Sequence, residues 1–198
     1  MVEKKPARGR PRDPALRRKI IAAAAALLDE GGITAVTMEA VAAKARVGKP
    51  TLYREWPNAQ ALAMAAFLET TRAQKPRTGK TRPLDALREQ LRAIARGFST
   101  RSGRNTAMMI AAAQHDSELA KVFRNRFIMA RREEGRTLLT RAIAAGALRA
   151  DTDTDLALDL IYAPLYFRLL IGHGPLDAAF TDAILDAALK GLGNPRKR

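Results

Sequence analysis

The sequence has no cysteine and only two histidines, His115 and His173, among its 198 residues. Disulfide frameworks and thiol nucleophiles are therefore excluded, and zinc sites built from cysteine and histidine lack their ligands. His115 is disfavoured as a metal ligand because no second histidine or acidic cluster stands at ligand spacing. We expect no metal and no cofactor, and a reducing, cytoplasmic setting fits a chain of this kind.

Long apolar runs and enzyme signatures are also missing. The longest stretch without Asp, Glu, Lys or Arg is residues 56–68, 13 residues, whereas a spanning helix needs about 18 or more. We therefore expect no membrane segment. The sequence also has no Walker-type glycine loop, no nucleophile elbow and no histidine–carboxylate spacing typical of catalysis. These absences disfavour an enzyme.

Positive charge is in excess, and the excess is unevenly placed. Lys and Arg number 35 against 20 Asp and Glu, which gives a net charge of +15. Residues 1–60 carry +6, residues 72–104 carry +8 and residues 121–149 carry +6, whereas residues 150–187 carry −6. Because 47% of the residues are hydrophobic, the charge belongs to a folded body and indicates an acidic partner.

The first 12 residues form a basic arm ahead of the first predicted helix. Within the arm, residues 8–11 read Arg-Gly-Arg-Pro, the core of the AT-hook pattern that lies in a narrow minor groove. Arg8, Arg10 and Arg12 are the candidate DNA contacts here. The alternative is a solubilising tail, and a second basic tail covers residues 194–198.

Apolar residues recur at helical spacing along the whole chain, and no convincing alternating strand pattern is present. The sequence therefore predicts an all-α fold of about nine helices. Its expected domains are a helix-turn-helix DNA-binding domain at 13–57 with three helices and a helical effector-binding and dimerisation domain at 58–193. The predicted helices cover about 14–30, 38–45, 49–56, 58–71, 84–98, 105–114, 118–145, 155–171 and 178–190.

Residues 37–56 predict two short helices joined by a tight turn, the arrangement of a helix-turn-helix. Such a motif needs small and apolar residues where its helices cross, and these positions hold Val41, Ala42, Ala45, Val47 and Leu52. Leu52 and Trp56 are expected in the core. The other positions face outward and are small, hydroxylic or basic, which suits an element in the major groove. With Thr37 at the start of the earlier helix, the candidate DNA-binding residues are Arg46, Gly48, Lys49, Pro50, Thr51, Tyr53 and Arg54.

The chain resembles the TetR family of bacterial transcriptional regulators over about residues 13–68. The resemblance is carried by Thr37, Val41-Ala42, Val47-Gly48-Lys49, Thr51-Leu52-Tyr53 and Trp56-Pro57-Asn58. It implies that the third helix reads operator bases, while Tyr53 and the helix N-termini hold the DNA backbone. Two positions depart from the family pattern.

Arg46 replaces the usual turn glycine, and Ala59 replaces a lysine that often touches phosphate. Either Arg46 supplies the missing phosphate contact or it tolerates a left-handed turn at some cost.

The resemblance also implies that the C-terminal helices enclose a small-molecule site. Adaptable or amphipathic side chains on the inner helices are the candidates, and each has a plain core position as its alternative. The candidate effector-pocket residues are Phe98, Met108, Met109, His115, Phe123, Phe127, Tyr162 and Tyr166.

A homodimer is expected because the predicted helix at 155–171 is apolar nearly all round and must be buried on more than one side. In TetR-like regulators the last two helices pair through a four-helix bundle, which would let the dimer read a palindromic operator. Pro164 lies inside this helix and shapes either a pocket or the dimer seam. The candidate interface residues are Leu160, Ala163, Pro164, Phe167, Leu170, Ile184, Leu185, Ala188 and Leu189.

Two function hypotheses remain open from the sequence. The favoured one is a ligand-responsive transcriptional repressor that binds a palindromic double-stranded DNA operator as a homodimer and is released by an unknown small-molecule effector. The alternative is an architectural, low-specificity DNA-binding protein without an effector, motivated by the basic segments 72–104 and 121–149 outside the helix-turn-helix.

Overall fold

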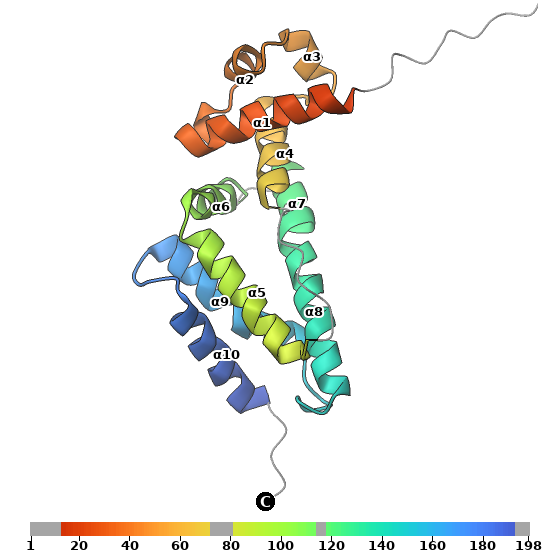
Figure 1. Ribbon diagram of the computed structural model, residues 1–198, viewed down its shortest axis with the longest axis vertical. Coiled ribbons are helices and arrows are strands. Elements are labelled where there is room, and N and C mark those ends of the chain that lie inside the picture. Colours follow the sequence, from red (N-terminus) through yellow and green to blue (C-terminus); the bar gives the residue numbers. More distant parts are fainter. Residues whose placement is uncertain (1–12, 72–80, 114–117, 193–198) are drawn as a thin grey trace, which may run out of the picture.

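The structure is a computed structural model that describes residues 13–71, 81–113 and 118–192. All regular elements in these ranges are helical, and Figure 1 shows two groups of helices stacked end to end. A 3-10 turn, Ile33–Ala35, and a π-helical turn, Arg124–Ile128, add to the α-helices. The α-helices are α1 (Pro14–Gly31), α2 (Met38–Ala45), α3 (Lys49–Tyr53), α4 (Ala59–Thr71), α5 (Pro83–Phe98), α6 (Arg101–Ala112), α7 (Glu118–Phe123), α8 (Met129–Ala144), α9 (Thr154–Ile171) and α10 (Ala178–Leu192).

Helices α1–α4, which we call the head, surround one core at the upper end of the molecule in Figure 1. The Asp13 carboxylate caps α1 by accepting the Ala15 N–H at 2.9 Å, and Thr37 caps α2 by accepting the Ala40 N–H at 3.1 Å. Leu52 and Trp56 are buried in this core as the sequence predicts, with 0% and 5% of their surface exposed. Local capping and one shared core thus fix the positions of α2 and α3.

Helix α4 shares the core of the head. Helix α4, assigned from sequence to the second domain, buries Leu62, Met64 and Phe67 in the head core. Phe123 and Phe127 from the later helices join the same core, where the Phe67 ring lies 4.9 Å from that of Phe127 between centroids. Helix α4 therefore packs chiefly against α1 and also against α7.

Helices α5, α8, α9 and α10 form the second bundle around a separate core. The predicted helix at 118–145 is interrupted, since α7 and α8 are joined by the π-helical turn Arg124–Ile128. Helix α6 begins at Arg101 and not at about residue 105. At the end of α8, Gly146 has a φ of +70°, a left-handed conformation suited to the glycine.

Ion pairs explain part of the positive charge of segments 72–104 and 121–149. Arg92 on α5 binds both carboxylate oxygens of Asp182 on α10, at 3.0 and 2.6 Å. Arg132 and Arg136 on α8 both reach Asp155 on α9, at 2.9 and 2.6 Å. The acidic segment 150–187 therefore neutralises arginines on the neighbouring helices, which joins α5 to α10 and α8 to α9.

These pairs predict a loss of stability in acid. Hydrogen bonds from Arg136 and then Arg132 lower the pKa of Asp155, and one from Arg92 chiefly lowers the pKa of Asp182. Each of these carboxylates has a lower pKa in the folded protein than in the unfolded chain, where it is about 4. Its charge therefore stabilises the fold above about pH 4, and this stabilisation is lost as the pH falls through the lower, folded pKa. We expect the D155N/D182N variant to be less stable than wild type at pH 7 in urea titrations.

The difference between the two proteins should shrink toward zero as the pH is lowered below 4. A constant difference from pH 7 to pH 3 would show that the two carboxylates do not contribute through their charge.

Candidate nucleic-acid interface and effector cavity

The turn between α2 and α3 is set by Arg46, which adopts a left-handed conformation with φ 52° and ψ 53°. It is the one non-glycine residue with positive φ in the described part of the chain. The Arg46 N–H donates to the Ala43 carbonyl at 3.1 Å, and the Val47 N–H donates to the Ala42 carbonyl at 3.0 Å. This pair of bonds ends α2 as a Schellman motif, which normally places glycine where Arg46 stands.

Replacing Arg46 by glycine should stabilise the protein. A side chain in the left-handed region costs about 1–2 kcal/mol, a cost that glycine does not have. Glycine loses more conformational entropy on folding, however, which offsets about 0.5–1 kcal/mol of this gain. We expect a net gain of about 0.5–1 kcal/mol in thermal or urea unfolding of R46G. DNA affinity measured on the same variant separates the two roles, because a loss of binding would show that the guanidinium contacts DNA.

Helix α3 presents its polar residues to solvent and buries only Leu52. Gly48, Lys49, Pro50 and Arg54 are exposed, Thr51 is half-buried, and Tyr53 exposes 52% of its surface. Apart from Leu52, the helix therefore contributes little to the head core. Its outer surface is free for a partner.

Gly48 at the start of α3 has ordinary backbone angles, φ −74° and ψ 143°. A Cβ added there would lie 3.6 Å from Pro50 Cδ, a normal contact. The fold therefore does not require glycine at this position. Because glycine has no side chain, another molecule can approach the backbone closely at Gly48.

The charged groups of this surface are partly paired with one another. The Lys49 ammonium donates to the Glu39 carboxylate at 2.8 Å, which lowers the pKa of Glu39 and raises the pKa of Lys49. The Arg54 guanidinium donates to Thr51 Oγ1 at 3.1 Å. These contacts are at the surface, so a phosphate group can compete for both cations. Arg8, Arg10 and Arg12 lie outside the described residues.

A cavity of about 1600 Å³ lies where the head meets the second bundle. Its walls come from α4 with Met64 and Leu68, from α5 with Ile94 and Phe98, and from the π-helical turn with Phe127. Ligand sites commonly measure about 300–1,000 Å³, so this cavity has room for a substantial small molecule. It touches both groups of helices.

The structure places the predicted pocket residues in several environments. Phe98 and Phe127 line the large cavity. Met109 and Phe123 are instead buried in the head core, and Tyr162 and Tyr166 pack in the second core. These four do not line the cavity because the apolar faces that carry them close onto neighbouring helices, and His115 lies outside the described residues.

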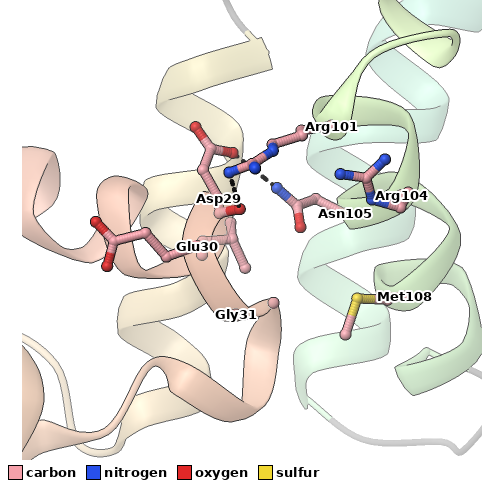
Figure 2. Close-up of a pocket in the computed structure, with 9 residues that line it drawn as sticks. Asp29, Glu30, Gly31, Arg101, Arg104, Asn105 and Met108 are labelled. Carbon is pink, nitrogen blue, oxygen red and sulfur yellow. Dashed lines mark hydrogen bonds between the residues drawn. The ribbon is translucent and has the colours of Figure 1, made fainter.

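Met108 lines a smaller pocket of about 240 Å³ between α1 and α6. Figure 2 shows Arg101 and Asn105 of α6 turned toward Asp29 at the end of α1. The Asn105 amide donates to the Asp29 carboxylate at 2.9 Å, and Arg101 donates to the Asp29 carbonyl at 3.3 Å. This pocket is therefore part of the junction between the head and α6.

Polar residues of the large cavity were not among the sequence candidates. Gln90 is 9% exposed; its amide oxygen accepts the Tyr162 hydroxyl at 2.8 Å and its amide nitrogen donates to the Glu134 carboxylate at 3.1 Å. Gly135 is needed beside this network, since a Cβ there would lie 2.6 Å from the Tyr162 hydroxyl oxygen. Burial raises the pKa of Tyr162, so it remains a neutral donor.

An apolar stripe on α9 remains exposed on the second bundle. Leu160 is 50% exposed, Phe167 59% and Leu170 49%, and Ala163 is also exposed, while Pro164 is half-buried. Helix α9 continues through Pro164 from Thr154 to Ile171. Within the described protomer, the Phe167 ring contacts that of His173 at 5.0 Å between centroids, yet the stripe remains about half exposed.

Two of the predicted interface residues on α10 are buried within the protomer. Leu185 is 0% exposed and Ile184 is 9% exposed, because both pack into the protomer's own core. They are unavailable to a second copy. Ala188 and Leu189 are half-buried, and the exposed small residues of this helix include Ala183 and Ala187.

Within the described ranges, no helix has the length and apolar character needed to cross a membrane. The same ranges contain no group of three or more His, Cys, Asp or Glu side chains suited to hold a metal ion.

Comparison with known proteins connects both parts of the chain to regulators. Residues 20–66 match the family described as bacterial regulatory proteins, tetR family. Residues 75–188 match the family described as Tetracyclin repressor-like, C-terminal domain. The two matches together span the head and the second bundle.

Individual relatives agree over nearly the whole chain. The uncharacterised HTH-type transcriptional regulator YdeS of Bacillus subtilis is 36% identical over 187 residues, 93% of each chain. The DNA-binding transcriptional repressor TetR of Mycobacteroides abscessus is 30% identical over 97% of this chain and 99% of its own. The crystal structure of the TetR family transcription regulator SCO0332 superposes with a TM-score of 0.74 at 33% identity, over 90% of this chain and 99% of that one. The chain is therefore no enzyme but a member of the TetR family of DNA-binding transcriptional regulators.

Proposed function

We propose that the protein is a ligand-responsive transcriptional repressor that acts in the cytoplasm as a homodimer on a palindromic DNA operator. The observation that carries this proposal is the outer surface of α3, which holds Gly48, Lys49, Thr51, Tyr53 and Arg54 above the buried Leu52. Small, hydroxylic and basic groups on a short helix suit major-groove bases and the flanking phosphates. Arg8, Arg10 and Arg12 of the preceding arm would add contacts in the minor groove.

Helix α4 supports a response to a ligand. Its buried residues belong to the head core, and Met64 and Leu68 also face the large cavity. A molecule that fills the cavity would therefore press on a helix that is packed against α1. Two conformations are then in equilibrium, one that binds the operator and one in which α4 is displaced. An effector that binds the displaced conformation more tightly lowers operator affinity, by at most the ratio of its affinities for the two conformations.

The apolar stripe on α9 supports a homodimer. Exposed Leu160, Phe167 and Leu170 on one helix face form a patch that a second copy can cover by two-fold symmetry. Two heads related by such an axis would contact two half-sites of a palindrome.

The architectural alternative loses much of its basis. It depended on the basic segments outside the helix-turn-helix, and Arg88, Arg92, Arg132 and Arg136 in those segments pair with aspartates of α9 and α10. Paired arginines contribute less to nonspecific phosphate binding than free ones.

The test is binding to DNA from the protein's own promoter region, measured by fluorescence anisotropy against random DNA of equal length. Specific regulators discriminate between such sequences by about 10³-fold or more. Equal affinity for both DNAs at two salt concentrations would overturn the proposal.

Removal of the Tyr53 hydroxyl gives a sharper version of this test. A hydrogen bond to a charged phosphate contributes about 1.5–3 kcal/mol, so Y53F should bind its operator roughly 10–100-fold more weakly. Stability should not change, because the side chain is half exposed. The matched control is Thr34→Val, which removes an exposed hydroxyl elsewhere on the head and should leave the affinity unaltered.

A further inference from the structure

Arg131 on α8 lines the large cavity and is held there without a carboxylate partner among the described residues. Its guanidinium donates to the backbone carbonyls of Phe127 at 3.3 Å and Thr71 at 3.4 Å, both long contacts. Its Cζ lies 3.8 Å from the centroid of the Phe127 ring. Burial lowers the pKa of Arg131. The next arginine, Arg132, instead pairs with Asp155 and Asp159.

The π-helical turn accounts for the position of this group. Residues 124–128 add an extra residue to the turn ahead of α8, which directs the Phe127 side chain into the aromatic cluster with Phe67 and Phe123. Arg131 follows one turn later and lies over the Phe127 ring. Such turns are rare and frequently occur at functional sites.

Among the described carboxylates around the cavity, Glu134 acts on Arg131 electrostatically and raises its pKa, but burial has the larger, opposite effect. Glu134 is exposed, and its carboxylate accepts the Gln90 amide at 3.1 Å rather than forming an ion pair with Arg131. Glu89 is bound to Arg92 at 3.0 Å. Arg17, Arg96, Arg126 and Glu69 also border the cavity and are exposed to solvent. Arg131 is thus a partly buried cation that forms no ion pair with a carboxylate of the described residues.

One part of the mixed polar and apolar cavity wall is lined by apolar side chains. Met64 and Leu68 on α4 and Ile94 and Phe98 on α5 provide aliphatic and aromatic surface. A half-buried guanidinium beside apolar side chains is matched by a ligand with one anionic end and an apolar body, since the planar group binds a carboxylate through two parallel hydrogen bonds.

We propose that the effector is an amphipathic carboxylic acid whose carboxylate pairs with Arg131 and whose apolar body lies against α4 and α5. This inference rests on the proposed ligand response and names the chemical class of the ligand. The carboxylate supplies the counter-charge that Arg131 lacks. The apolar body contacts Met64 and Leu68, the residues of α4 that connect the cavity to the head.

Calorimetric titration of the full-length protein with decanoate tests the proposal, with decanol and decylammonium as neutral and cationic probes. We expect decanoate to bind, and its affinity to rise by about fourfold for each methylene added from octanoate to dodecanoate. Arg131→Gln should weaken decanoate binding at least tenfold, whereas Arg131→Lys should retain part of the affinity. Arg124→Gln, an exposed arginine of the same region that does not line the cavity, is the matched control and should bind like wild type.

Circular dichroism melting of each variant separates a lost site from a lost fold. Equal binding of decanol and decanoate, or decanoate binding unaffected by Arg131→Gln, would overturn the proposal. Preferred binding of decylammonium that disappears in Glu134→Gln would also overturn it and assign the site to cations. Operator binding without ligand is measured separately, so failure of the carboxylate proposal is distinguishable from failure of the regulatory one.

Discussion

Replacing Leu52 by alanine should destabilise the protein by about 2–5 kcal/mol, the range for a fully buried leucine. Leu52 is 0% exposed and is the single buried residue of α3. The five-residue helix has too few hydrogen bonds to persist alone, so its position depends on this side chain. Urea unfolding measures the loss of stability, and anisotropy should show that operator binding falls with it.

The matched control for this prediction is Leu52→Met. Methionine conserves the volume of the side chain, and such exchanges usually cost less than about 1.5 kcal/mol. The L52M variant should therefore keep both the fold and DNA binding. Equal stability of L52A and wild type would show that α3 is fixed by some other contact.

The elements with regular apolar periodicity or a capping residue were predictable from the sequence. Asp13 and Thr37 cap helices where their side-chain chemistry indicates, and Leu52 and Trp56 are buried as predicted. The interruption of the helix at residues 118–145 was not predictable. A π-helical turn changes one hydrogen-bonding register and leaves the apolar pattern almost unaltered, so periodicity does not reveal it.

The candidate DNA-binding surface was more accessible to sequence reasoning than the cavity. Outward residues of a short helix follow from its period alone, and the structure exposes Gly48, Lys49 and Tyr53. The cavity depends on which helices meet, and periodicity does not specify this. Gln90 nevertheless left a signal, because it is a polar residue on the otherwise apolar face that carries Leu87 and Leu91.

The net charges of sequence segments likewise predicted only part of the electrostatics of the fold. Segment totals revealed that residues 72–104 and 121–149 are basic and that residues 150–187 are acidic. They did not reveal that these segments are neighbours in space. Arg92 with Asp182 and Arg136 with Asp155 show the pairing that the fold creates.

The last expected result concerns Phe167, where substitution by glutamate should dissociate the proposed homodimer. Phe167 exposes 59% of its surface on the apolar stripe of α9. Loss of a side chain that anchors an interface costs at least about 2 kcal/mol of binding free energy. A two-fold interface contains Phe167 of both protomers, so the substitution acts twice. The dimer should therefore weaken by about 4 kcal/mol, roughly 10³-fold. Light scattering after size-exclusion chromatography at micromolar concentration should report a monomer for F167E and a dimer for wild type.

A matched control distinguishes a specific interface from general surface hydrophobicity. Met129 on α8 is 45% exposed but does not lie on the α9 stripe, so M129E adds the same charge at a comparable apolar site and should remain dimeric. The F167E variant should bind the operator weakly, because a single head contacts one half-site only. Its helices should still unfold cooperatively on heating, as in wild type. A dimeric F167E protein would place the interface on another face. Dissociation of both variants would show that the loss of the dimer is not specific to the α9 stripe.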